Sequence, residues 1–385
     1  MILPCQKHLF DIPDGVTYLN CAYLSPLLGS VHEAGVRGLA RKRHPWTIVR
    51  ADFHNETETV RALFAGLIGA QADDIAIVPA TSYGIAVAAA NLPIGRSQNI
   101  VLLADQHSSN FHQWRVQAER QGAELRTVPR PADGDWTAAV LEALDAATAV
   151  AALPNVHWTD GGRLDLVTIG QRCRDLGTAL VVDGTQSVGA MPLDVGEVQP
   201  DFLVCSAYKW LLCPYTLGFL YAASHRQSGR PIEEHGANRA GAEHAEGRTT
   251  YKVEFQPGAR RYDMGERSNF INLPMAVGAL MQIRDWGVAN IAHTLAQIVD
   301  AAAEIGASLG LHAPPKPHRA PHMIGIRSAD GFAPALAQAL AAEGIHVSVR
   351  GGALRISPHL YNTTAHLERL FTTLRRHLKE SPSPT

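Results

Sequence analysis

The feature that most constrains the fold of this chain is a regular alternation of short apolar runs with segments of helical periodicity. Helical patterns such as 56–69, 110–122 and 166–177 separate the apolar runs. Several runs are continuously apolar, which is typical of strands buried on both faces of a sheet. The alternation therefore predicts an α/β fold with a mostly parallel sheet. The expected strands are 75–78, 99–103, 124–128, 149–153, 179–183, 202–205 and 217–221.

The length of 385 residues is too great for one compact core, and it predicts two domains. We expect an N-terminal segment (1–50) that joins the small domain and the active-site rim, a large domain (51–285) and a small α+β domain (286–385). The polar segment 226–261 has little periodicity, which favours a functional loop over a linker. After it, the pattern predicts a helix at 273–309, a strand at 322–327, a helix at 334–343, strands at 345–349 and 353–357, and a helix at 363–378.

Charge and cysteine content narrow the class of partner and the compartment. A formal net charge of −2 gives no long-range attraction to nucleic acid or to a membrane surface. No apolar run approaches the roughly 18–20 residues of a membrane helix. The five cysteines form no CxxC pair, and the histidines form no HExxH motif, so no metal site is expected. We therefore expect a cytoplasmic protein that acts on a small molecule, with Cys173 and Cys205 as core thiols.

Two ionisable residues follow neighbouring buried strands in the middle of the chain. Asp183 ends one apolar run, and Lys209 follows the next run after Ser206 and Tyr208. The carboxyl ends of parallel strands form the edge where α/β sheets bind ligands. A partly desolvated lysine there is a nucleophile and a proton shuttle, and a carboxylate there can raise the pKa of a pyridine nitrogen. Taken alone, either residue is more often a surface lysine or a helix-capping aspartate.

Two further signals complete a recognisable set. Thr81 and Ser82 follow the strand 75–78 and open a helix (85–91), where hydroxyls and free N–H groups form an anion site. An ordinary helix cap has the same sequence. His107 follows the strand 99–103 and is placed to stack on a ring. An imine-forming amine, an acid, a phosphate cup and a stacking ring are what pyridoxal 5′-phosphate (PLP) requires of a protein.

The run VVDGTQSVGAMPLDV, followed by PDFLVCSAYKW, resembles the cofactor signature of the class V aminotransferase family. This family of fold-type-I PLP-dependent enzymes includes cysteine desulfurases, isopenicillin-epimerase-like proteins and kynureninase. The resemblance extends from Tyr18 to Asn362. It implies a fold-type-I PLP-dependent transferase fold, with a large domain around a mostly parallel seven-stranded sheet and a smaller α+β domain. It also implies a homodimer with active sites at the subunit interface.

The resemblance also implies roles for the cofactor-binding residues. Lys209 would carry the internal aldimine and move the substrate's α-proton, with Asp183 on the pyridine nitrogen and His107 stacked on the ring as the other catalytic residues. Gln186 would bind the 3′-oxygen region. The phosphate would be held by Thr81, Ser82, Ser206 and Tyr208, with Ser268 reaching it from the partner subunit.

Substrate contacts follow from the same resemblance. Arg355 matches the arginine that grips the α-carboxylate, a bidentate task suited to guanidinium. Asn155 would lie near the substrate and the ring oxygen, and Asn269 of one subunit would reach the substrate of the other. The side-chain pocket would be lined by Asn20, Tyr23, His157, Trp158 and the loop 226–261.

Departures from relatives limit the reaction type. Desulfurases carry a nucleophilic cysteine on a loop before the carboxylate-binding arginine, whereas the stretch 347–355 is short and has no cysteine. Kynureninase usually has histidine where Gln186 stands. We therefore expect a PLP-dependent lyase acting through an external aldimine and a quinonoid, with an aminotransferase or an epimerase as alternatives because the side-chain pocket decides between them. A non-catalytic PLP-fold protein is a remote alternative. A nucleotide-binding oxidoreductase would need a GxGxxG fingerprint, which the chain lacks.

Overall fold

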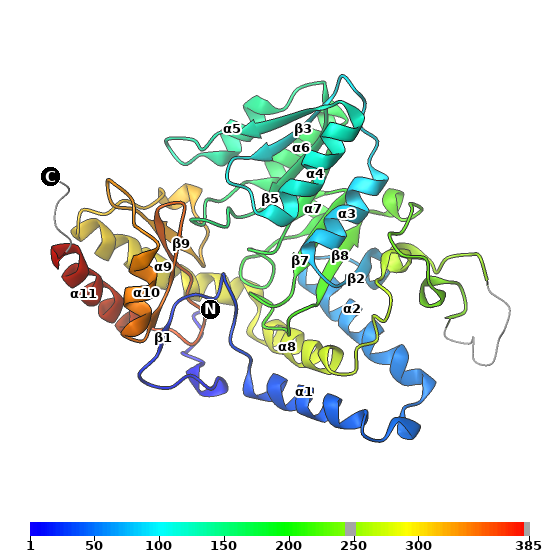
Figure 1. Cartoon of the computed structure of the whole chain (residues 1–385), viewed down its shortest axis with the longest axis horizontal. Helices are drawn as coiled ribbons and strands as arrows, with labels where there is room; N and C mark the ends of the chain where they lie inside the picture. The colour runs from blue at the N-terminus through cyan, green and yellow to red at the C-terminus, as the bar shows by residue number, and fades with distance from the viewer. Residues whose placement is uncertain (243–251, 381–385) are drawn as a thin grey trace.

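The computed structural model describes residues 1–242 and 252–380, and its centre is a seven-stranded sheet (Figure 1). The strand order is β2-β8-β7-β6-β5-β3-β4; β8 runs antiparallel to both of its neighbours, and the other pairs are parallel. The predicted set of seven strands and the mostly parallel sheet are thus confirmed. The strands are β2 (Ile75–Val78), β3 (Asn99–Leu103), β4 (Glu124–Val128), β5 (Thr148–Pro154), β6 (Ala179–Asp183), β7 (Phe202–Ser206) and β8 (Gly218–Ala222).

Both faces of this sheet are covered, which explains why most of its strands are apolar along their length; the edge strand β4, with the sequence ELRTV, is the exception. In β3, Ile100 and Leu102 pack into one core and Val101 and Leu103 into the other, and all four side chains are buried. Helices α3 and α4 cover the first face, and α5 and α6 contribute to the second core. The helices up to this point in the chain are α1 (Gly29–Arg41), α2 (Asn55–Leu67), α3 (Thr81–Asn91), α4 (Ser108–Gln121), α5 (Trp136–Ala143), α6 (Leu166–Leu176) and α7 (Val195–Val198).

Two boundaries in the chain differ from the expectation. The predicted helix 273–309 is two helices, α8 (Asn272–Trp286) and α9 (Val288–Ser308), because Gly287 adopts a φ of 77° and ends the first helix. The predicted strand 345–349 is also divided, into β10 (Ile345–His346) and β11 (Ser348–Arg350). The two halves pair with different strands, so the chain must turn between them.

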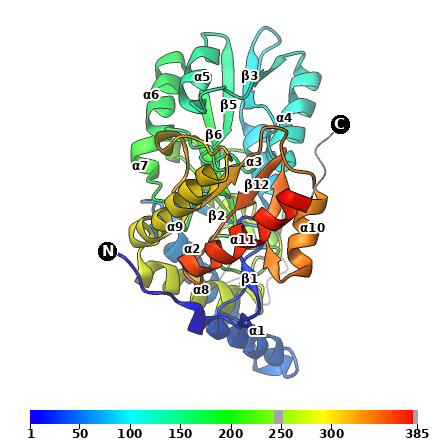
Figure 2. The same cartoon turned by 90° about the vertical axis from the view of Figure 1, so that its left-hand side faces the viewer.

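The C-terminal residues build a smaller α+β unit around a three-stranded antiparallel sheet of order β11-β12-β9 (Figure 2). Besides β11, the sheet contains β9 (Ile324–Ile326) and β12 (Ala353–Ile356). The unit also contains the helices α10 (Ala335–Ala342) and α11 (Thr364–Glu380). Near the N-terminus, β1 (Thr17–Tyr18) pairs in parallel with β10. The first residues of the chain therefore lie against this unit, while the domain boundaries at residues 50 and 285 stay a prediction.

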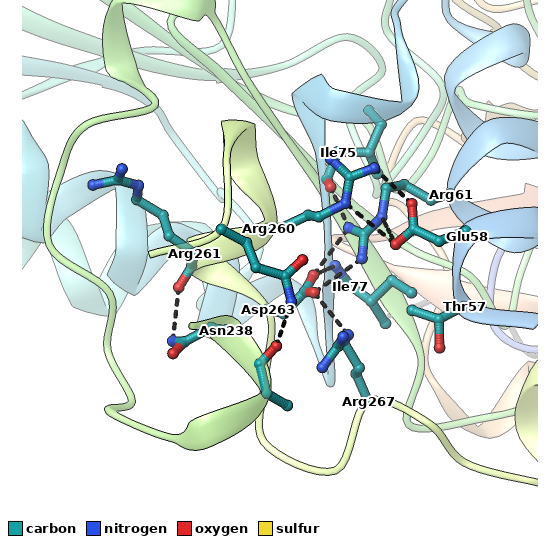
Figure 3. Close-up of polar contacts among 12 residues, drawn as sticks. Thr57, Glu58, Arg61, Ile75, Ile77, Asn238, Arg260, Arg261, Asp263 and Arg267 are labelled. Atoms are coloured by element: carbon teal, nitrogen blue, oxygen red, sulfur yellow. Dashed lines mark hydrogen bonds and ion pairs between the residues drawn. The ribbon is translucent and has the colours of Figure 1, made fainter. Parts of the chain in front are cut away.

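A buried ion cluster fixes the chain that follows the polar segment 226–261 onto the large sheet (Figure 3). Asp263 accepts two hydrogen bonds from Arg61 of α2, at 2.9 and 3.0 Å, and its Oδ1 accepts another from the N–H of Ile77 in β2 at 2.8 Å. Arg267 Nε lies 2.9 Å from the same carboxylate. All three charged side chains are at most 2% exposed. Paired buried charges of this kind hold the loop 263–270 in one position on α2 and β2.

The described parts of the polar segment are irregular, as predicted, and short 3₁₀ turns lie at Ser224–Arg226, Gly236–Asn238 and Gly258–Tyr262. Part of it, residues 243–251, lies outside the described residues. Among the helices of residues 1–242 and 252–380, none has the length and apolar character needed to span a membrane.

Candidate active site

Lys209 and Asp183 open onto the same cavity, at the carboxyl ends of β6 and β7. Both side chains therefore line one cavity, while their catalytic roles stay a prediction. The cavity lies at the edge formed by the carboxyl ends of the parallel strands, which is where sheets of this kind bind ligands. The cavity is lined by Thr81, Gln106, His107, Ser109, Pro154, Val156, Trp158, Asp183, Thr185, Gln186, Ser206, Tyr208 and Lys209.

Lys209 is buried, with 5% of its surface exposed. Burial, and next the charge of Arg355, lowers the pKa of its amine to about 8, against the opposing effect of Asp183. Since a neutral amine is the nucleophile, this environment makes Lys209 reactive towards a carbonyl group at a lower pH than an exposed lysine, with half of the amine neutral at about pH 8.

Asp183 is the last residue of β6 and is 6% exposed. Its Oδ1 accepts a 3.0 Å hydrogen bond from the N–H of Thr185. A carboxylate has about four acceptor positions, so this one retains capacity for a donor inside the cavity. A protonated pyridine nitrogen is such a donor.

Three hydroxyl groups cluster at the beginning of α3. Thr81 Oγ1 lies 2.6 Å from Ser206 Oγ and 2.9 Å from Thr185 Oγ1. The helix begins at Thr81, earlier than expected; its N-cap residue Ala80 has no polar side chain, and the N–H of Thr81 donates to Ser206 Oγ at 3.3 Å. Hydroxyls and free N–H groups at a helix N-terminus fit a phosphate. Thr185 was not predicted, although it stands inside the DGTQ motif. Ser82, which was predicted, is exposed and follows the lining residue Thr81 without lining the cavity itself.

His107 occupies the N-cap position of α4 and presents its ring to the cavity. The ring packs edge-on against Trp158, with centroids 5.3 Å apart, and Nδ1 accepts a 3.4 Å hydrogen bond from the N–H of Ser109. Burial lowers its pKa, so the imidazole is neutral at neutral pH. A neutral ring suits stacking on an aromatic cofactor. Gln106 and Ser109 also line the cavity, and sequence reasoning missed both.

Tyr208 lines the cavity, whereas Asn155 stands in the chain between the lining residues Pro154 and Val156 and is not itself part of the lining. Asn155 donates to the carbonyl of Leu164 at 3.1 Å, and its Oδ1 is buried without a hydrogen-bond partner among the described residues. A buried unpaired oxygen costs free energy unless a ligand satisfies it. The amine of Lys209 lies 5.5 Å from the ring centroid of Tyr208.

Arg355 lies on β12 and is 1% exposed. Its Nη1 donates to the backbone carbonyl of Trp158 at 2.7 Å, while its Nε has no hydrogen-bond partner among the described residues. Burial, and next the charge of Arg350, lowers its pKa to about 9. A buried guanidinium whose bonding partner is a neutral carbonyl is prepared to receive an anion.

Asn20 lies beside Arg355, because its Oδ1 accepts a 2.8 Å hydrogen bond from Ser348 Oγ, and Ser348 pairs with Arg355 across the β11–β12 ladder. Tyr23 is nearby in the chain and 57% exposed. The proposed roles of both residues in the substrate pocket stay predictions. The prediction that His157 lines the pocket is wrong. His157 is fully buried, and its ring nitrogens lie 2.8 Å from Thr159 Oγ1 and 3.0 Å from the carbonyl of Ala104.

Ser268 and Asn269 do not line the cavity of Lys209. They lie along a separate hollow of about 830 Å³, together with Phe53 and Arg267. Ser268 Oγ donates to the carbonyl of Phe53 at 2.5 Å, and Asn269 Oδ1 accepts from the N–H groups that begin α8. Their predicted contact with the site of a partner subunit concerns a second chain and stays a prediction.

This combination of sheet, smaller α+β unit and buried lysine–carboxylate pair defines a PLP-dependent enzyme of fold type I. The Aminotransferase class-V family matches residues 43–370, and the chain belongs to that family. An uncharacterized aminotransferase, YcbU of Bacillus subtilis, is 28% identical over 322 residues, 80% of each chain.

Solved structures of cysteine-processing enzymes have the same fold. An apo cysteine desulfurase from Thermococcus onnurineus superposes with a TM-score of 0.85 over 99% of this chain and 100% of its own, at 20% identity. The cystine C–S lyase C-DES, in complex with its product cysteine persulfide, gives a TM-score of 0.82 over 94% of this chain and 97% of its own, at 19% identity. At these identities the likeness shows the fold alone.

Proposed function

We propose that this enzyme is a lyase that releases a leaving group from Cβ of an amino acid, with a C–S bond as the favoured target and a C–C bond as the alternative. The observation that carries the proposal is the combination of a buried lysine base with a β11–β12 hairpin that has no cysteine. The hairpin turns through Gly351 and Gly352, in the stretch where desulfurases carry their nucleophile. A lyase needs the lysine and does not need the thiolate.

The remaining cysteines support this choice. Cys21, Cys173, Cys205 and Cys213 are buried, and burial raises the pKa of each thiol; for Cys21 and Cys173 it reaches about 12. None of these four is a thiolate near neutral pH, and no cysteine lines the cavity of Lys209. A persulfide-forming step therefore has no nucleophile there.

The chain's own residues divide the work. PLP, when bound, supplies an electron sink that acidifies the Cα–H bond of an attached amino acid. Lys209 is the group placed to hold PLP and to accept and return the α-proton, while Asp183 keeps the ring nitrogen protonated. Thr81, Thr185 and Ser206 would hold the phosphate. Removal of the leaving group and hydrolysis of the remainder give a keto acid and ammonia.

Arg355 would bind the substrate's α-carboxylate. Its buried charge, its unsatisfied Nε and its exchangeable bond to the Trp158 carbonyl support this role. The solved structure of the cystine C–S lyase C-DES supports a sulfur-bearing leaving group. The curated relative named as an aminotransferase supports the alternative in which the amino group is transferred instead.

We further propose that the enzyme works in the cytoplasm as a homodimer, with a small amino acid as substrate and neither nucleic acid nor membrane as partner. Large exposed apolar side chains lie on α1, on the segment that follows it, and on the residue before α8. Exposed apolar groups in this number mark a protein interface. They are Val36, Leu39, Trp46, Val49, Phe53 and Ile271.

The deciding experiment incubates the holoenzyme with a panel of amino acids, with and without a keto-acid acceptor. A lyase releases keto acid and ammonia in equal amounts without the acceptor, and sulfide or a thiol from sulfur-bearing substrates. Keto acid that forms only with the acceptor identifies an aminotransferase, and loss of optical activity alone identifies an epimerase. Asp183→Asn should lower turnover by about 100- to 1,000-fold, whereas the exposed control Asp330→Asn should leave it unchanged.

A further inference from the structure

The side-chain amide of Gln186 is held at both ends inside the protein. Its Oε1 accepts a 2.9 Å hydrogen bond from the indole Nε1 of Trp210, and its Nε2 donates to the backbone carbonyl of Ala22 at 3.1 Å. An indole nitrogen only donates and a carbonyl only accepts. Two independent partners therefore require the same orientation of the amide, with the oxygen towards Trp210.

The orientation has a chemical consequence for the cavity. An amide nitrogen carries two hydrogens, and Ala22 takes one of them. Gln186 lines the cavity together with Lys209 and Asp183. The second hydrogen of Nε2 is thus left for a ligand in the cavity, whereas a flipped amide would present its carbonyl oxygen instead.

Trp210 is itself fixed. It follows Lys209 in the chain, and its side chain is fully buried. Its ring packs edge-on against the ring of His322, with centroids 4.5 Å apart. The Nε2 of His322 lies 2.6 Å from the backbone carbonyl of Gln186, so that nitrogen carries the proton and donates it. Burial lowers the pKa of His322 to about 4, which keeps the ring neutral. Side chain and backbone of Gln186 are therefore held by two residues that also contact each other.

We propose that Trp210 is a positioning residue that makes Gln186 present an N–H donor to the phenolic oxygen of bound PLP. The proposal rests on the PLP-dependent function. A donor on that oxygen stabilises its negative charge most when the neighbouring nitrogen, which joins Lys209 to the cofactor, carries no proton. The donor thereby favours the deprotonated state and lowers the pH at which this nitrogen titrates.

The experiment is a pH titration of the visible absorption of the holoenzyme and of Trp210→Phe. Loss of the indole N–H frees the Gln186 amide to turn, so the midpoint should rise by about one pH unit, the effect of one hydrogen bond to a charged group. The matched control is Trp286→Phe, which removes another buried indole and should leave the midpoint unchanged. The rings of Trp210 and Trp286 both lie near the ring of His359, with centroids 6.2 and 6.0 Å from it.

A double-mutant cycle separates this role from a general packing effect. Gln186→Leu should raise the midpoint, and adding Trp210→Phe to it should raise it no further. Two shifts that add would overturn the proposal, as would an unchanged midpoint in Trp210→Phe. The other titratable groups around Lys209 are the same in all variants; they are Cys21, His107, Asp183, Cys205, Tyr208, His322 and Arg355.

Benzothienylalanine at position 210 provides a test that does not depend on the folding of the phenylalanine variant. It keeps the shape of the indole ring and has sulfur in place of the N–H. The same rise in midpoint is expected, and an unchanged midpoint would overturn the proposal. A wild-type protein that takes up PLP without any visible band would instead contradict the function on which the proposal rests.

Discussion

Arg355 of β12 donates from Nη1 to the backbone carbonyl of Trp158, 2.7 Å away, across the boundary between the small unit and the large sheet. The ring of the same tryptophan meets His107 edge-on, and its Nε1 donates to the carbonyl of Asp105 at 2.6 Å. Trp158 thus contacts both Arg355, the expected carboxylate-binding residue, and His107, the expected ring-stacking residue. If a substrate carboxylate replaced the Trp158 carbonyl as the partner of Arg355, substrate binding would be coupled to Trp158 and to His107.

Arg355→Gln tests the carboxylate role. Loss of a hydrogen-bonded ion pair with the substrate should lower kcat/KM by roughly 10- to 150-fold, from about 1.5–3 kcal/mol. The ratio of activity on an amino acid to activity on its amide should fall towards one, because only the acid uses the guanidinium. Arg375→Gln, an exposed change on α11, is the control and should preserve that ratio. An unchanged ratio in Arg355→Gln would remove Arg355 from substrate binding.

The pKa of Lys209 predicts how the apoenzyme captures PLP. Below about pH 8 the amine is protonated and unreactive, so the rate of capture should rise with pH and level off above a midpoint of about 8. Because Arg355 is one cause of the lowered pKa, Arg355→Gln should move this midpoint upward. Stopped-flow absorbance measures the rate. A midpoint near that of free lysine, about 10.4, would show that the amine is not desolvated.

Thr81→Val tests the phosphate site with little change in volume. It removes a hydroxyl within 2.9 Å of Thr185 and Ser206, and hydrogen bonds to a charged phosphate contribute about 1.5–3 kcal/mol. The dissociation constant for PLP should therefore rise roughly 10- to 150-fold, as measured by equilibrium dialysis. Thr372→Val on the exposed face of α11 should not change it. Equal affinities for wild type and Thr81→Val would place the phosphate elsewhere.

Asp263→Asn tests the buried ion cluster. It leaves the guanidinium groups of Arg61 and Arg267 buried without their carboxylate, which should destabilise the fold by about 3–5 kcal/mol. Urea unfolding measures the change, and the exposed Asp330→Asn should stay within about 0.5 kcal/mol of wild type. A loss below about 1 kcal/mol for Asp263→Asn would mean that water or another group replaces the carboxylate.

Much of the large sheet was predictable because burial on both faces leaves a clear apolar run in most of its strands, the edge strand β4 excepted. Asp183 and Lys209 were predictable for the same reason, since each follows such a run at a ligand-binding edge. The break at Gly287 was not, because a single glycine is tolerated inside helical patterns and the apolar periodicity continues on both sides. The pairing of 345–349 with two different strands depends on contacts with β1, more than 300 residues away.

Within the site, sequence reasoning found residues whose side chains have distinctive chemistry, and it missed common residue types that the fold brings into the cavity. Thr185 is one of many threonines, and only the fold brings it within 2.9 Å of Thr81. His157 was expected among the residues that line the side-chain pocket, but its ring stacks on Trp136, with centroids 5.0 Å apart, inside the core. Ser268 and Asn269 concern a surface that a second chain would complete, and a single sequence does not determine that contact.

The most direct test is borohydride reduction of the yellow holoenzyme, followed by proteolysis and mass spectrometry of the labelled peptide. A buried Lys209 that shares a cavity with Asp183 predicts a single pyridoxyl label, on Lys209, and none in Lys209→Ala. A label on any other lysine, or a protein that stays colourless after PLP is added, would contradict the proposed chemistry.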